Sequence, residues 1–242
     1  MQDILQDIVS HTHKLGFITT LKVTAETDTQ IESMADDRSV IMSATTHSPV
    51  GEFVGTFGMP DLGKLDYHLK NPEYRENATI EVVQAERNGE TIPTHIHFEN
   101  ASGDFENDYR FMNQAIIDEK LKTVKFKGAT WNVEFQPSVA SIARMKLMSA
   151  AHAEEPTFNV STKDSNLVFA FGDASTHAGE FVFQHGIEGT LTHTWSWPVA
   201  QVQSILGLDG DKTMSISDQG AMQITVDSGM VKYHYILPAQ SK

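Results

Sequence analysis

The first fifteen residues alternate between apolar and polar positions with the period of an α-helix. One stripe carries Ile4, Leu5, Ile8, Thr12 and Leu15, and the opposite face carries Asp3, Gln6, Ser10 and Lys14. This pattern predicts an amphipathic helix over residues 2–15. After Gly16 the period changes to two in the run FITTLKVTAE, which predicts a β-strand.

The rest of the first half reads as short strands around one further helix. Strand-like runs occupy residues 39–46, 52–57, 78–86, 91–99 and 108–112, and an Asn88-Gly89 turn joins the third and fourth. Pro60 stands where the first turn of a helix accepts proline. Leu62, Leu65 and Leu69 then form one apolar stripe until Asn71-Pro72 ends the predicted helix.

The second half repeats this order of elements. Pro137 and Ser138 are expected to open a helix that runs to about Ala153, and a shorter helix follows Pro198. Strands are expected at residues 122–128, 130–136, 157–162, 166–171, 180–186, 191–197, 212–217, 221–226 and 230–237.

The two halves resemble each other in sequence as well as in order. Residues 54–69 and 191–206 share a strand, an aromatic residue, a proline and a short amphipathic helix. Leu5, Ile8 and Val9 correspond in the same way to Val139, Ile142 and Ala143. The repeat predicts an α+β protein with two tandem similar domains of antiparallel sheet, each carrying two helices. The expected domains are residues 1–112 and 123–242, joined by a connector at 113–122. The alternative is that any two α+β halves look alike at this level of detail.

Composition narrows the class of protein. The 242 residues carry 32 acidic and 18 basic side chains, a net charge of −14, which excludes a surface that binds nucleic acid all over but permits a small basic patch. No cysteine is present, so disulfides, thiolate metal sites and cysteine nucleophiles are excluded. No apolar run is long enough for a membrane span, and Asp3 and Asp7 stand where a signal peptide would be basic. We therefore expect a cytoplasmic protein without membrane contact.

The histidines offer one candidate for metal chemistry. His95, His97 and Glu99 alternate along a predicted strand and so share one face, as in a cupin-like metal-dependent β-barrel enzyme. The glycine-bounded pattern of such barrels is missing, and an ordinary polar strand face is the preferred interpretation. Phosphate loops, nucleophile elbows and nuclease aspartate clusters are also missing from the sequence. We expect no catalytic residues, no cofactor and no metal site.

Basic residues follow the polar faces of the predicted helices. Lys14 lies on the first, Lys64 on the second with Lys70 near its end, and Arg144 opposite the Val139/Ala143/Leu147 stripe of the third, with Lys146 at its margin. In so acidic a chain this placement suggests a surface for an anionic partner. The alternative is that these are ordinary solubilising charges, and the fourth helix offers no cation.

The C-terminus ends in an apolar segment. If Ile236, Leu237 and Pro238 lay beside Ile116, Ile117 and Leu121, they would form a surface groove for a partner. Alternatively, the segment packs on its own sheet.

Taken in order, these features resemble the DNA polymerase sliding clamps related to proliferating-cell nuclear antigen. The resemblance rests on the tandem domains, on residues 34–42 (MADDRSVIM) and on an ending of the form Gly-x-Val-Lys-Tyr-x-Tyr-x-Leu-Pro. Residues 57–74, FGMPDLGKLDYHLKNPEY, are most similar to the clamps of large tailed phages of the T-even and cyanophage type.

Such a resemblance implies a closed homotrimeric ring around double-stranded DNA that tethers a polymerase for processive replication and is loaded by an ATP-dependent clamp loader. It implies that the DNA is faced by Lys14, Lys64, Lys70, Arg144 and Lys146. Partner peptides would bind Met34, Val40, Ile116, Ile117, Leu121, Tyr235, Ile236, Leu237 and Pro238. Asp3, Asp7, Asp61 and Asp66 on the helices depart from a basic lining. Two other classes stay open: the metal-dependent barrel enzyme and a structural virion protein.

Overall fold

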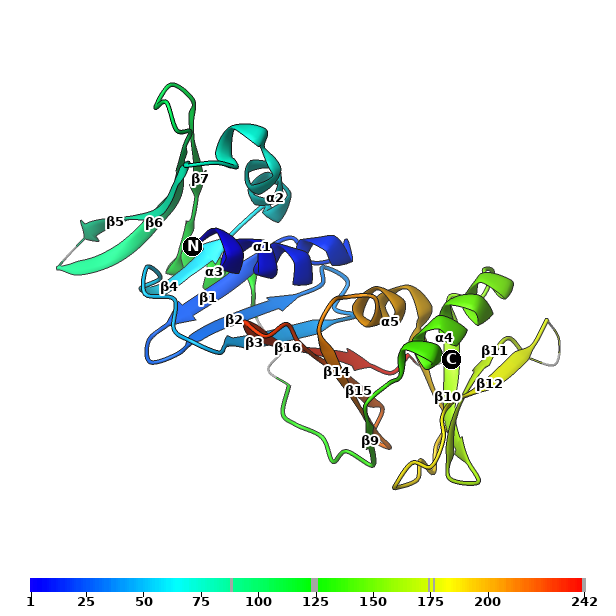
Figure 1. The fold of residues 1–242 in the computed structure, drawn as a ribbon. Coiled ribbons are helices and arrows are strands. Elements are labelled where there is room, and N and C mark those ends of the chain that lie inside the picture. Colours follow the sequence, from blue (N-terminus) through cyan, green and yellow to red (C-terminus); the bar gives the residue numbers. More distant parts are fainter. Residues whose placement is uncertain (88, 123–125, 174, 176, 241–242) are drawn as a thin grey trace. The chain divides into compact units, whose positions relative to one another are not determined.

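The computed structural model describes the chain except residues 88, 123–125, 174, 176 and 241–242 (Figure 1). It divides into two compact units. Unit 1 contains residues 1–124 and 228–233, and unit 2 contains residues 125–227 and 234–242. Within the described residues, no helix combines the length and apolar character needed to cross a membrane.

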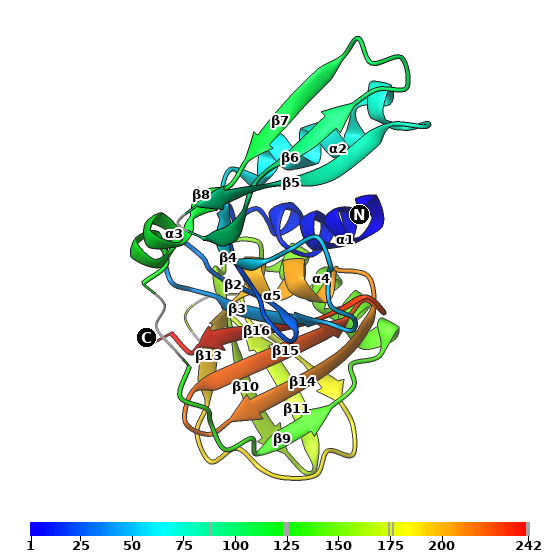
Figure 2. The same ribbon diagram turned by 90° about the vertical axis from the view of Figure 1, so that its left-hand side faces the viewer.

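Unit 1 contains two helices that pack against each other on one face of an antiparallel sheet (Figures 1 and 2). Its elements are α1 (Gln2–His11), the short 3₁₀ helix η1 (His13–Leu15), β1 (Leu21–Ala25), β2 (Thr29–Met34), β3 (Ile41–Thr46), β4 (Gly55–Met59), α2 (Leu62–Lys70), η2 (Pro72–Tyr74), β5 (Thr79–Arg87), β6 (Glu90–Glu99), β7 (Glu106–Arg110), β8 (Met112–Asn113) and α3 (Gln114–Lys120). One sheet has the strand order β8-β4-β1-β2-β3, and a second has the order β5-β6-β7.

Unit 2 repeats this plan. Its elements are β9 (Val133–Phe135), α4 (Val139–Ala151), β10 (Thr157–Lys163), β11 (Asn166–Phe171), β12 (Gly179–Gln184), β13 (Trp195–Pro198), α5 (Val199–Leu206), β14 (Asp211–Ser217), β15 (Ala221–Asp227) and β16 (Val231–Pro238). The first three residues of β16 belong to unit 1. The strand orders are β12-β11-β10-β13 and β16-β15-β14-β9, and α4 packs against α5 and β12.

The expected fold class is confirmed, because both units contain antiparallel sheets with a pair of helices. The repeat is visible in the strand orders: β4-β1-β2-β3 of unit 1 matches β13-β10-β11-β12 of unit 2, and β5-β6-β7 matches β14-β15-β16. The expected domain limits at residues 112 and 123 stay predictions.

Burial of alternate residues explains why these segments form half-buried strands. In β1 and β2, Leu21, Val23 and Ile31 are fully buried, whereas the intervening side chains are more exposed. Unit 2 has an aromatic core in which the rings of Phe169 and Phe183 stack with centroids 4.2 Å apart.

Three sequence expectations differ from the structure. The helix expected over residues 2–15 ends at His11, where the Thr12 hydroxyl donates to the Ile8 carbonyl at 2.6 Å, and η1 follows. The expected connector at 113–122 contains helix α3, capped by Asn113, whose side chain accepts from the N–H of Ile116 at 3.0 Å. Of the strand expected at 122–128, residues 123–125 lie outside the described residues and 126–128 form no strand.

Candidate nucleic-acid interface and partner surface

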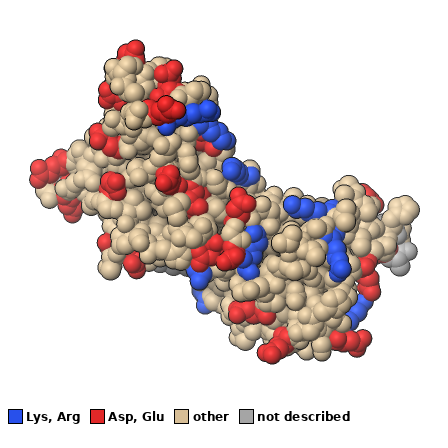
Figure 3. All heavy atoms as spheres, viewed as in Figure 1, with Lys and Arg blue, Asp and Glu red and all other residues tan. Residues whose placement is uncertain are grey.

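The helices of unit 1, including the short η1, carry three of the expected DNA-facing cations. Lys64 and Lys70 are exposed on α2, and Lys14 is exposed on η1 rather than on α1, because α1 ends three residues before it. Figure 3 shows Lys and Arg atoms near the α1 and α2 helices, with some Asp and Glu atoms among them, whereas Asp and Glu atoms cover the ends of the β5–β6 and β6–β7 hairpins. Within unit 1, the helix surface is therefore less acidic than the hairpin tips.

Both lysines of α2 form ion pairs with nearby aspartates, one in the helix and one just before it. The Lys64 Nζ lies 3.4 Å from Asp61 Oδ2, and the Lys70 Nζ lies 2.5 Å from Asp66 Oδ2. Pairs of this kind between exposed side chains contribute little to stability. They do lower the net positive charge that α2 presents, so this surface attracts a polyanion only weakly.

Asp7 is not a surface anion. The sequence pattern had listed it among the acidic helix residues that do not fit a basic DNA-facing surface. Its side chain is 9% exposed, and its Oδ2 accepts from the hydroxyls of Tyr233 at 2.7 Å and Ser228 at 3.0 Å. The ring of His11 stacks on Tyr233 with centroids 4.7 Å apart. The carboxylate therefore anchors α1 within unit 1, whereas Asp3 on the same helix is exposed.

Helix α4 presents a different face from the one that the sequence predicted. Val139 is 85% exposed and Leu147 is 73% exposed, whereas Ser141 and Met145 are buried. The expected apolar stripe of Val139, Ala143 and Leu147 is therefore not the buried face of this helix. α4 has apolar residues around most of its circumference, so its sequence does not select one face.

Arg144 and Lys146 are both exposed on α4, but they flank its exposed apolar face on two sides. Residues two apart on a helix point about 160° apart, so the two cations cannot face one target squarely together. Among the described residues, neither has an acidic side chain within ion-pair distance. These two cations are therefore less compensated than those of α2.

Helix α4 packs on the terminal strand of a sheet. Where Gly179 begins β12, a Cβ would lie 2.7 Å from His152 Nε2 and 3.0 Å from Met148 Sδ, so α4 packs closely on this strand. β12 is the terminal strand of its sheet. Leu147, one residue before Met148, is an exposed apolar side chain on the helix that packs on this strand.

Most of the expected peptide-binding residues of unit 1 are core residues. Val40 and Ile117 are fully buried, Leu121 is 8% exposed, and Met34 is half-buried. Ile117 packs on β4, where a Cβ on Gly58 would lie 2.9 Å from its side chain. Ile116 is 50% exposed and is the member of this group that offers an apolar surface.

The expected peptide-binding residues of unit 2 lie mainly within their own sheet. Tyr235 and Leu237 are fully buried, Ile236 is 8% exposed and Pro238 is exposed. The Trp197 indole N–H donates to the Leu237 carbonyl at 3.2 Å. The end of the chain is therefore part of the fold, and its role in a partner site stays a prediction.

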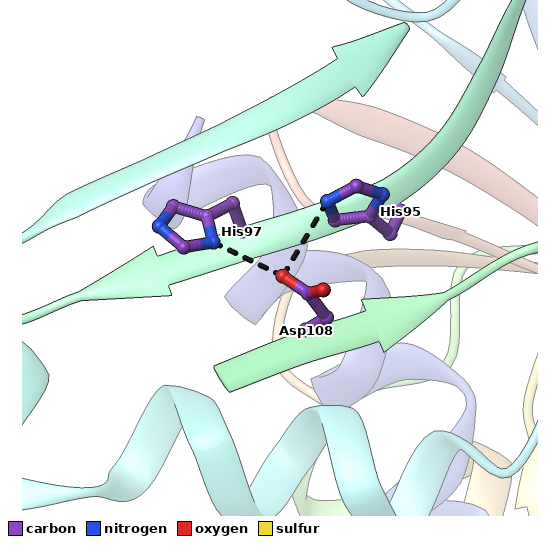
Figure 4. A group of neighbouring side chains, drawn as sticks. All are labelled: His95, His97 and Asp108. Carbon is purple, nitrogen blue, oxygen red and sulfur yellow. Dashed lines mark hydrogen bonds and ion pairs between the residues drawn. The ribbon is translucent and has the colours of Figure 1, made fainter. Parts of the chain in front are cut away.

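A cluster of titratable side chains occupies the face of β6 and β7 that points away from the core of that sheet (Figure 4). The Asp108 Oδ1 lies 3.0 Å from His97 Nδ1 and 3.4 Å from His95 Nε2. Hydrogen bonding to Asp108 raises the pKa of His97, and the same bond lowers the pKa of Asp108. Desolvation lowers the pKa of His95.

These histidines do not lie in a barrel. β5, β6 and β7 form an open three-stranded sheet, and the described strands of unit 1 show no cupin-like barrel around it. The alternative of a barrel enzyme built on His95, His97 and Glu99 therefore receives no support. Sequence pattern had missed Asp108, because its proximity depends on the pairing of β6 with β7.

No protein-family model and no curated protein matches this sequence. Among solved structures, the chain is similar to that of A. fulgidus PCNA with the C-terminal region of FEN-1 bound, with a TM-score of 0.68 at 10% identity over 100% of this chain and 95% of the other. It is also similar to PCNA from Thermococcus kodakaraensis, with a TM-score of 0.68 at 12% identity over 98% and 97% of the two chains. The protein therefore has the fold of the PCNA-type sliding clamps over its whole length.

Proposed function

We propose that this chain is a non-catalytic sliding clamp, of which three copies form a ring around duplex DNA and tether the replicative polymerase. The observation that carries the proposal is the likeness to PCNA structures across nearly the full length of both chains. Residues 57–74 favour the type found in large tailed phages, where the protein would work in the cytoplasm of the host cell.

The open edges of the sheets support a ring. Within unit 1, β3 lies next to the start of β16, and the His47 N–H donates to the Met230 carbonyl at 2.8 Å. In the internal repeat, β12 takes the place of β3 and β7 takes the place of β16, yet both are terminal strands of their sheets. Pairing β12 of one copy with β7 of the next would repeat this contact head to tail and remove both edges.

Exposed apolar side chains lie on the helices that pack on these two sheets. Leu147 lies on α4, which packs on β12, and Tyr67, which is 69% exposed, lies on α2. α2 packs against the β5–β7 sheet, because the His68 ring lies on Phe98 of β6 with centroids 5.2 Å apart. A contact between copies at these edges would remove large apolar surfaces from water.

The charge distribution suits a protein that slides. Three chains of −14 each give −42 for the ring, which repels DNA from acidic outer surfaces. The helices would then be the surface that attracts DNA, because they carry Lys14, Arg144, Lys146 and the partly compensated Lys64 and Lys70. Few phosphate contacts mean little counterion release, so the DNA is held by topology more than by affinity.

Partner proteins would bind through short apolar peptides. One of the similar structures contains PCNA bound to the C-terminal region of FEN-1. We place such a site around the exposed Ile116 of α3, with Met34 of the same unit as a further candidate. The polymerase and an ATP-dependent clamp loader would compete for it.

Reversing charge on two helices tests the DNA-facing surface. The double variant Lys64→Glu/Arg144→Glu is expected to thread at least about tenfold less protein onto a linear duplex that is immobilised at one end and is blocked at the other with streptavidin only after threading, because threading at 50 mM salt depends on attraction to the phosphates. The difference from wild type should shrink at 300 mM salt, where exposed charges are screened.

The matched control is Lys163→Glu/Lys232→Glu, which changes the net charge equally at exposed strand positions and should stay within about twofold of wild type. Equal losses in the two double variants would mean that total charge, and not the helix surface, governs retention.

A further inference from the structure

Three cross-strand pairs line the outward face of β6 and β7. His95 faces Arg110, His97 faces Asp108 and Glu99 faces Glu106. The opposite face of these strands carries Ile96, Phe98 and Tyr109, which are buried. The six outward side chains therefore form one continuous polar surface, with two carboxylates directly opposite each other at one end. Like charges in this position repel each other, and a bound cation would relieve that repulsion.

The imidazoles of His95 and His97 converge on one carboxylate oxygen. Figure 4 shows both rings turned toward Asp108, and the ligand atoms of the three residues all lie within 4.8 Å of one another. The His97 Nε2, on the far side of its ring, lies 3.6 Å from Glu99 Oε2. Among the described residues, this is the one group of three such side chains that gathers so closely.

Neighbouring groups hold two of these side chains in place. The Nδ1 of His95 lies 2.9 Å from the Thr94 hydroxyl, which itself donates to the Val83 carbonyl at 3.0 Å. The Arg110 guanidinium also lies 3.3 Å from this Nδ1, so two neighbours fix the ring with its Nε2 toward Asp108. Arg110 donates to Asp108 Oδ2 at 2.9 Å, so Oδ1 is the oxygen left for a third partner.

We propose that His95, His97 and Asp108 form a binding site for a divalent transition metal ion of the Zn²⁺ class. Tetrahedral zinc with bonds of about 2.0–2.1 Å places its ligand atoms about 3.3 Å apart, close to the 3.0 Å and 3.4 Å separations at Asp108. Two imidazoles select zinc, cobalt or nickel over calcium and magnesium, which prefer oxygen ligands. The half-exposed position leaves a coordination site for water, whereas Glu99 lies at the Nε2 of His97, on the far side of the ring.

Such an ion would join two neighbouring strands. Because His95 and His97 belong to β6 and Asp108 belongs to β7, the metal would fasten the terminal strand of this sheet to its neighbour. Binding to the folded chain alone raises its thermal stability by linkage. The site does not depend on the clamp proposal, because all three ligands come from one unit of one chain.

Calorimetric titration of the full chain with ZnCl₂ tests the site. Wild type is expected to bind one Zn²⁺ per chain, and His97→Gln and Asp108→Asn are each expected to weaken that binding at least tenfold. His193→Gln is the matched control, because His193 pairs with Asp218 at 3.2 Å without a second histidine in the pair. Its affinity should equal that of wild type.

Two further readouts separate binding at the site from effects on folding. Circular dichroism should show that the variants are folded, and excess Zn²⁺ should raise the melting temperature of wild type and His193→Gln only. Co²⁺ should give the visible absorption bands of a low-symmetry site in the same two proteins. Absence of stoichiometric binding to wild type, or unchanged affinity in His97→Gln and Asp108→Asn, would overturn the proposal.

Discussion

Replacing Leu147 with glutamate is expected to dissociate the proposed ring into single chains. Leu147 is 73% exposed on α4, next to the residue that packs on Gly179 at the open edge of β12. Losing the burial of one leucine costs about 1.5–3 kcal/mol, and an unpaired carboxylate in the contact adds several more. Each contact should therefore weaken at least about a hundredfold. Sedimentation velocity at micromolar concentration measures the change, since the wild-type ring would have a mass of about 80 kDa and the chain has 26.8 kDa.

Ile116→Glu provides the matched control for this substitution. Ile116 is also an exposed apolar helix residue, at 50%, but it lies on α3 in the proposed peptide site. It should leave the sedimentation mass unchanged and weaken binding of an apolar partner peptide, and circular dichroism should show that both variants are folded. If Ile116→Glu dissociated the ring and Leu147→Glu did not, the contact between copies would involve α3 and not α4.

Replacing Asp7 with alanine is expected to destabilise unit 1 strongly. The carboxylate accepts hydrogen bonds from the hydroxyls of Tyr233 and Ser228, and the Tyr233 side chain is fully buried. Without the carboxylate, these donors lose a charged acceptor in a place that water reaches poorly. We expect a loss of about 2–4 kcal/mol in the free energy of unfolding, measured by urea denaturation.

Asp3→Ala tests whether the effect of Asp7→Ala comes from this network. Asp3 is exposed on the same helix, so its removal changes the net charge equally and should shift the free energy of unfolding by less than about 0.5 kcal/mol. Tyr233→Phe should reproduce part of the loss, because it deletes one of the two donors. Similar stability of Asp7→Ala and Asp3→Ala would mean that the buried carboxylate contributes nothing.

Periodicity predicted most of the secondary structure because each element buries one face. α2 is the clearest example: Leu62, Leu65 and Leu69 are buried, and the helix ends at Lys70, just before Asn71-Pro72. The internal repeat was visible for the same reason, since both units place equivalent strands and helices in the same order.

The candidate site was less predictable because exposure depends on tertiary packing. α4 has apolar side chains on nearly every side, so the sequence could not show that Ser141 and Met145 face inward and Leu147 outward. Asp108 reaches the two histidines only through the register of β6 with β7. Likewise, Val40, Ile117 and Leu237 are apolar in sequence, but sequence alone could not show whether they line a surface groove or lie in the core, where the structure places them.

The central claim is that the protein encircles duplex DNA, and retention on a linear duplex blocked at both ends tests it directly. A ring that has threaded onto the duplex should remain through a wash at 300 mM salt and should be released completely when a restriction enzyme cuts the DNA. Loss of the protein in the wash would contradict encirclement, because the DNA would then not be held by topology. Retention after the cut would also contradict it, because the protein would then be held by surface affinity alone.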